Sequence, residues 1–162
     1  MRITRPTLAC EEVYVKAAQL MLSAMGVPED EQSLDDMVEA LKEPGEVFEG
    51  LKSLEYNSWI IRDQDIQVFM AKENYREQAL KDVIRDWVAR HRILPQCEVG
   101  QEVKMQEEQG MALAIISEVL QADGMYRVHF TQSSDREKMA SVPYEAVHDL
   151  AQPAEAFQLL AG

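Results

Sequence analysis

The chain has few of the residues that form disulfide bonds and phosphate-binding loops, and it has no long apolar run of the kind that spans a membrane. It has seven glycines and two cysteines in 162 residues. No run approaches the roughly 20 apolar residues of a membrane-spanning helix, and nothing resembles a phosphate-cradling loop or a dinucleotide fingerprint. Cys10 and Cys97 are too few for a disulfide framework, which favours two reduced thiols in a cytosolic protein. The N-terminus has no apolar core of signal-peptide length, so we expect a soluble, cytoplasmic protein.

Positive charge is also scarce, because 16 lysines and arginines face 29 acidic residues, for a net charge of −13. Such a charge repels nucleic acid and anionic membranes, and it leaves a basic protein open as a partner. The segment from Glu29 to Glu49 contains nine acidic residues against Lys42 alone. Its helical spacing predicts a negative face with these members: Asp35, Asp36, Glu39 and Glu43. The face is interpreted either as ordinary solvated surface or as a docking surface for a partner.

The sequence contains no pattern typical of catalysis or metal binding. His91, His129 and His148 are far apart, and none stands at metal-ligand spacing with another histidine, cysteine or carboxylate. Cys10 is expected in the first turn of a helix, which favours a thiolate, but no histidine lies near it in sequence to act as a base. We therefore assign no catalytic residue, metal site or cofactor.

The first ninety-odd residues carry apolar positions at helical spacing and predict about five helices. The first should begin near Thr7, which could cap it, and end at Gly26. Ser33 should open the second, which Pro44 stops. A third should turn Val47, Phe48, Leu51 and Leu54 inward, and a fourth apolar group runs from Trp59 to Met70. The last helix should be capped by Asn74 and end near Arg92, because Pro95 prevents a longer one.

After about residue 97 the apolar period falls to two, which is typical of strands. The expected strands are Val99–Met105, Ala112–Leu120, Met125–Phe130 and Ala140–Pro143, with turns at Gly110 and Asp123–Gly124. Alternation places Tyr126, Val128 and Phe130 on one face of the third strand. The strand Ala112–Leu120 is apolar on both faces and so must be covered on both. We expect one of its faces to pack against the helices.

The order of these segments is Val-Gly-x-x-Val, a long apolar strand, Asp-Gly-x-Tyr-x-Val-x-Phe and Val-Pro-x-x-x-Val. This order resembles an SH3-like small β-barrel of the Tudor type over about residues 97–150. The resemblance implies an aromatic cage that binds methylated lysine or arginine by cation–π attraction. The matching positions are Tyr126 and Phe130, with Tyr144 as a third wall. The chain departs from the pattern at 131–137, where such domains often carry an acidic, glycine-containing turn. The same aromatics could instead be barrel core.

The sequence thus predicts an α+β protein with an N-terminal bundle of about five helices packed on a C-terminal SH3-like barrel. The expected parts are a helical domain (1–95), the barrel (96–150) and a tail (151–162) that could form a short helix. The order of the parts, with helices first and the barrel last, also looks like that of the β subunit of nitrile hydratases. That likeness would make this chain a non-catalytic partner of a metalloenzyme. That likeness is architectural only.

We expect a non-enzymatic interaction protein, an adaptor or a regulator. It would bind a protein partner, with a basic one favoured by charge, through the barrel mouth or the acidic helical face. Two alternatives stay open: an accessory subunit of an enzyme complex, and an acidic mimic that occupies a DNA- or RNA-binding protein. The sequence does not define an oligomeric state.

Overall fold

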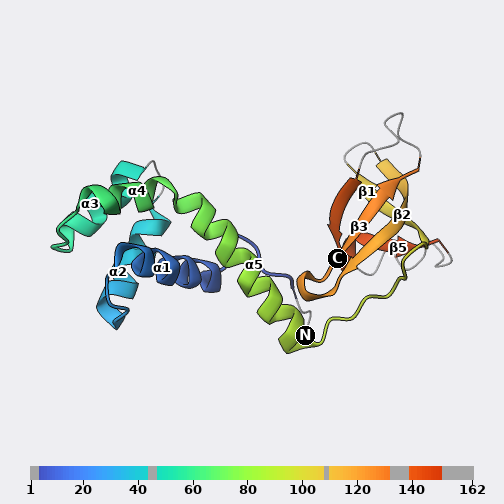
Figure 1. Cartoon of the computed structure of the whole chain (residues 1–162), viewed down its shortest axis with the longest axis horizontal. Coiled ribbons are helices and arrows are strands. Elements are labelled where there is room, and N and C mark those ends of the chain that lie inside the picture. The colour runs from blue at the N-terminus through green and yellow to red at the C-terminus, as the bar shows by residue number, and fades with distance from the viewer. Residues whose placement is uncertain (1–3, 44–46, 108–109, 132–138, 151–162) are drawn as a thin grey trace. The chain divides into compact units, whose positions relative to one another are not determined.

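A computed structural model describes residues 4–43, 47–107, 110–131 and 139–150 (Figure 1). The chain divides into two compact units, residues 1–87 and 88–162, here called the helical unit and the sheet unit. Five helices come first and a five-stranded antiparallel sheet follows, which confirms the predicted α+β class. The predicted tail helix at 151–162 and most of the turn at 131–137 lie outside the described residues. The predicted packing of the barrel on the helices stays a prediction.

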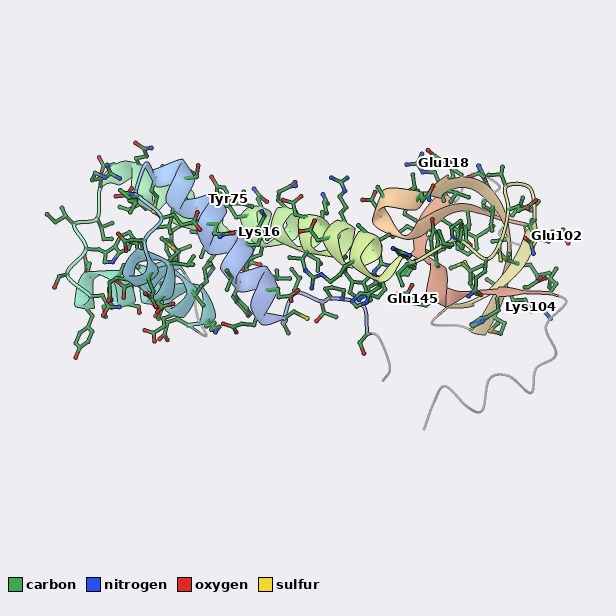
Figure 2. All side chains as sticks on the ribbon, turned by 90° about the horizontal axis from the view of Figure 1, so that it is seen from below. Lys16, Tyr75, Glu102, Lys104, Glu118 and Glu145 are labelled. Carbon is green, nitrogen blue, oxygen red and sulfur yellow. The ribbon has the colours of Figure 1, made fainter. Side chains whose placement is uncertain are left out.

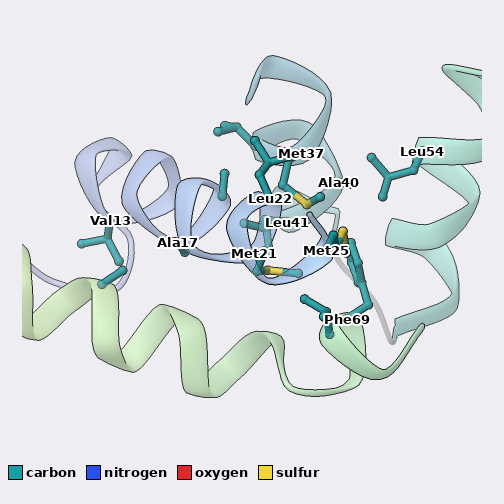
Figure 3. Close-up of a cluster of buried hydrophobic side chains, with 14 of the residues drawn as sticks. Val13, Ala17, Met21, Leu22, Met25, Met37, Ala40, Leu41, Leu54 and Phe69 are labelled. Carbon is teal, nitrogen blue, oxygen red and sulfur yellow. The ribbon is translucent and has the colours of Figure 1, made fainter. Parts of the chain in front are cut away.

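The helices are α1 (Glu11–Met25), α2 (Glu31–Lys42), α3 (Val47–Tyr56), α4 (Asp63–Met70) and α5 (Lys72–His91). Buried side chains of the first four converge in one cluster (Figure 3). Met21 and Met25 come from α1, Met37 from α2, Leu54 from α3 and Phe69 from α4. Three of these five are methionines, whose unbranched side chains fill irregular gaps between helices.

The helix starts differ from those predicted, whereas several ends agree. The first helix begins at Glu11 with Cys10 at its N-cap, because Thr7 is part of the preceding turn. The last begins at Lys72, so Asn74 lies inside it. Three helices end in a residue with left-handed backbone dihedral angles. The backbone N–H groups of that residue and of the next one donate hydrogen bonds to the last carbonyls of the helix, as in a Schellman motif. These residues are Gly26, Ser58 and Arg92.

The sheet unit contains β1 (Glu102–Glu107), β2 (Gly110–Leu120), β3 (Met125–Phe130), β4 (Met139–Pro143) and β5 (Val147–Asp149). Their order is β4-β3-β2-β1-β5, and every neighbouring pair is antiparallel. The predicted alternation in β3 is confirmed: Tyr126, Val128 and Phe130 are buried, and the residues between them are half-exposed. The predicted first strand starts later than expected, because Val99 and Gly100 form a turn in which Gly100 has φ +87°.

The inner face of the sheet forms its own core from strand residues, Cys97 and Tyr144. Between Ile116 and Glu118 the register of β2 against β3 shifts, a β-bulge that bends and twists the strand. On the opposite face, Glu102 and Lys104 of β1 and Glu118 of β2 are exposed (Figure 2). In the ranges given above, no helix has the length and apolar character needed to cross a membrane.

Candidate functional site

Residues 29–49, here called the acidic segment, hold the whole charge imbalance of the helical unit. The segment has nine acidic residues and one lysine, whereas the rest of residues 1–87 has nine of each sign. Two of the predicted face residues, Asp35 and Glu39, are exposed on α2, and Glu43 is exposed just after it. The structure therefore gives the helical unit one strongly negative region on an otherwise balanced background.

The single base of the segment does little to neutralise this region. The Lys42 ammonium lies 2.7 Å from the Glu11 carboxylate of α1 and 5.8 Å from the centre of the Tyr14 ring. Its charge is thereby directed to α1 and away from the other acids of α2. An exposed ion pair of this kind is weak, but it places the ammonium group beside the Glu11 carboxylate.

Asp36 does not share the exposed face that the sequence predicted for it. Its side chain is buried, and its two carboxylate oxygens accept hydrogen bonds from Trp59 Nε1 at 2.8 Å and Gln32 Nε2 at 2.9 Å. Asp35 and Glu39 are exposed, as that spacing predicts, but Asp36 lies one residue further round the helix and faces Trp59 of the same chain. Asp36 therefore anchors the turn after α3 and leaves Asp35, Glu39 and Glu43 as the exposed members of the set.

The acidic segment begins with a well-formed helix start. Asp30, not Ser33, is the N-cap of α2, and its carboxylate accepts a hydrogen bond from the Ser33 backbone N–H at 2.8 Å. That bond holds the pKa of Asp30 below its usual range. A carboxylate at the positive end of the helix dipole is also favourable, so negative charge is locally stabilised where the segment starts.

The outward face of α3 carries two aromatic side chains, one of which the sequence placed inside. Phe48, predicted to point inward, is 60% exposed, and Tyr56 is 91% exposed. The helix turns its other side to the core because Gly50 brings its backbone close to Phe69 and to the Ala40 carbonyl. Spacing of four residues between Phe48, Lys52 and Tyr56 was the available signal, since such positions line one helix face.

The three aromatics proposed as a cage all belong to the buried core of the sheet unit and face inward. Tyr126, Phe130 and Tyr144 are all buried, and Tyr126 is only 1% exposed. The rings of Tyr126 and Tyr144 lie with centroids 4.4 Å apart at an interplanar angle of 42°. Buried rings offer no open face to a methylated cation. In this conformation their geometry is that of core packing.

The Tyr126 hydroxyl has a specific structural task that sequence reasoning missed. It accepts hydrogen bonds from the backbone N–H groups of Gln96 at 2.8 Å and Cys97 at 2.9 Å. Burial raises the pKa of the Tyr126 phenol and also that of the Cys97 thiol, where the nearby Asp149 carboxylate adds to the effect. The raised pKa values keep both groups neutral. The two hydrogen bonds to the hydroxyl fasten the segment before β1 to β3.

Among the described side chains, no group points to metal or thiol chemistry. Within the ranges that the structure covers, no three histidine, cysteine or acidic side chains are arranged to hold a metal ion. Cys10 is half-buried and Cys97 is buried, and neither is in a disulfide. The raised pKa of Cys97 opposes thiolate formation. The exposed charge and aromatic groups of the helical unit are therefore the strongest candidate surface.

Comparison with known proteins gives no relative: no protein-family model, curated protein or solved structure matches this chain.

Proposed function

We propose that the chain is a non-enzymatic interaction protein whose helical unit docks a basic protein through the acidic segment. The observation that carries this proposal is the confinement of the unit's charge imbalance to residues 29–49, with Asp35, Glu39 and Glu43 exposed there. A concentrated field of one sign steers an oppositely charged partner and favours one orientation of encounter. The burial of Tyr126, Phe130 and Tyr144 favours this surface over the barrel mouth.

A charge-reversal pair with a matched control tests the proposal. Asp35→Lys with Glu39→Lys reverses two negative charges on the exposed face of α2, and Glu77→Lys with Asp86→Lys makes the same net change at exposed positions of α5. Each bait is used to capture partners from the native cell, and affinity for each captured chain is then measured at low and at physiological salt.

We expect the α2 pair to weaken binding of a basic chain by at least about tenfold, mostly through the association rate. The α5 pair should keep wild-type affinity. Equal losses in both variants would reduce the effect to overall charge and refute a localised docking surface. Capture of a nucleic-acid-binding protein whose bound nucleic acid is displaced would identify the mimic alternative, and co-purification in fixed ratio with one large enzyme chain would identify the accessory-subunit alternative.

We further propose that the five-stranded sheet is curled into an SH3-like barrel and that the protein works in the cytoplasm. Support for the barrel comes from β1, which pairs with both β2 and β5, from the bulge at Ile116/Glu118, and from a core that the unit's own residues fill. NMR contacts between β4 and β5 should be observed, and a flat sheet would lack them. Two free thiols are typical of a reducing compartment.

A further inference from the structure

The outward face of α3 presents a continuous row of three side chains, Phe48, Lys52 and Tyr56, here called the α3 stripe. Residues four apart on a helix are neighbours on its surface, and all three are exposed. The opposite face is fixed, because Gly50 and Leu54 are buried in the helical core. The stripe therefore cannot turn inward without dismantling the packing of α3.

The chemistry of the stripe is mixed in a specific way. The Lys52 ammonium lies 4.5 Å from the centre of the Phe48 ring, a cation–π contact that already shows this face accepting a cation. Exposed carboxylates flank the row, Glu49 on one side and Glu55 on the other. A surface with two aromatic rings along its centre, the Lys52 side chain between them and carboxylates at its edges matches a ligand with an apolar row and cationic borders.

The charge around the stripe decides between occupants. The acidic segment runs into α3 at Glu49, and α2 packs against α3. A second copy docked on the same face would bring two acidic segments together, which like-charge repulsion disfavours. Nucleic acid is disfavoured for the same reason. A basic protein segment meets no such penalty.

We propose that the α3 stripe is the apolar anchor for a basic amphipathic helix of a partner protein. Side chains at i and i+4 of that helix cover Phe48 and Tyr56, and its flanking lysines and arginines meet Glu49, Glu55 and the acids of α2. This is recognition of a helix by its apolar row and charged borders. The inference rests on the proposed function, because it names the kind of segment that the acidic surface docks.

The test uses the full-length protein and two labelled synthetic peptides of equal composition. One places leucine and phenylalanine on one face of a lysine- and arginine-rich helix, and the other has the same residues scrambled so that no apolar face forms. Binding is followed by fluorescence anisotropy at physiological salt. The variants are Phe48→Ala with Tyr56→Ala, and the control Leu94→Ala with Val99→Ala, which removes apolar side chains exposed to 65% and 62% elsewhere in the chain.

We expect the stripe variant to weaken binding of the amphipathic peptide at least tenfold and the control variant to leave it unchanged. The scrambled peptide should bind more weakly and should not distinguish the stripe variant from wild type. Equal binding of the two peptides, or a loss of less than twofold in the stripe variant, would overturn the inference. In that case loss of binding with Asp35→Lys and Glu39→Lys would still uphold the acidic docking surface, and its retention would overturn that proposal as well.

A second measurement remains informative if a variant folds poorly. Titration of the wild-type protein with the amphipathic peptide should shift backbone amide signals of residues 47–56 in an NMR spectrum. Shifts confined to the strands, or a concentration-dependent dimer that the peptide does not displace, would place the occupant elsewhere and refute the assignment.

Discussion

Replacing Gly50 by alanine should destabilise the helical unit, although alanine is the better helix former. A Cβ at this position would lie 2.5 Å from Phe69 Cε1 and 2.8 Å from the Ala40 carbonyl oxygen. Phe69 is fully buried, so its ring can move only by displacing neighbouring core side chains. The close approach of α3 to α2 and α4 thus depends on the missing side chain.

The two opposing effects can be compared in size. Alanine in place of glycine gains about 1 kcal/mol of helix propensity. Overpacking a filled core costs about 1–3 kcal/mol, occasionally more, and both contacts at Gly50 are shorter than 3.0 Å, one of them to backbone. We expect the upper end of that range and hence a net loss of about 1–2 kcal/mol in the free energy of unfolding.

Urea denaturation followed by tryptophan fluorescence measures this loss, since both tryptophans, Trp59 and Trp87, belong to the helical unit. Combining Gly50→Ala with Phe69→Leu provides the control. The smaller side chain relieves one of the two contacts, so the double variant should lose less than the sum of the single losses. A Gly50→Ala protein as stable as wild type, or more stable, would refute the packing argument.

Further predictions concern single contacts in each unit. Tyr126→Phe leaves the buried Cys97 N–H without its acceptor and should cost the sheet unit about 1–3 kcal/mol, measured by hydrogen exchange, with the exposed Tyr56→Phe as a neutral control. Burial raises the pKa of Cys97 and of Tyr126 above their unfolded values, so the sheet unit should lose stability as pH rises above about 9. Circular dichroism would follow this loss, and its absence would contradict the burial of the two groups as the cause of their raised pKa values. The hydrogen bond from Arg62 lowers the pKa of Asp65, so stability of the helical unit should fall as pH drops below 3.8, the ordinary value, toward the lower pKa of the folded state. Asp65→Asn should flatten that acid-side dependence in urea titrations. Ser58→Gly should raise the melting temperature through a gain of about 0.5–1 kcal/mol, because Ser58 has φ +70° and glycine adopts that conformation without strain; an unchanged or lower melting temperature would argue against strain at that turn.

Periodicity predicted the elements well where a repeated pattern fixed them. The alternation through Tyr126 and Phe130 identified β3. Gly26 predicted the end of α1, and Pro95 predicted that α5 ends a few residues before it. Strand β5 was missed because three residues, Val147–Asp149, are too few to show a period, and only pairing with β1 defines them. Local patterns therefore specify long elements, whereas short ones depend on partners distant in sequence.

The candidate surface was predictable in its charge and not in its aromatic part. The run of acids from 29 to 49 can be seen directly in the sequence, but the inward turn of Asp36 depends on Trp59, which is 23 residues away. Phe48 was placed inside because a large apolar residue at helical spacing is usually core. Its exposure follows from the approach of Gly50 to Phe69, a contact between two helices that no local pattern contains.

The placement of the two tryptophans gives the helical unit its own optical signal. The indole of Trp59 donates to Asp36 beside the acidic segment, and the ring of Trp87 lies 5.9 Å from the Arg5 guanidinium carbon. Tryptophan emission therefore comes from residues 1–87 alone, because the sheet unit contains no tryptophan. A change in tryptophan emission on adding a partner would thus show that the surroundings of Trp59 or Trp87 have changed, without any label attached.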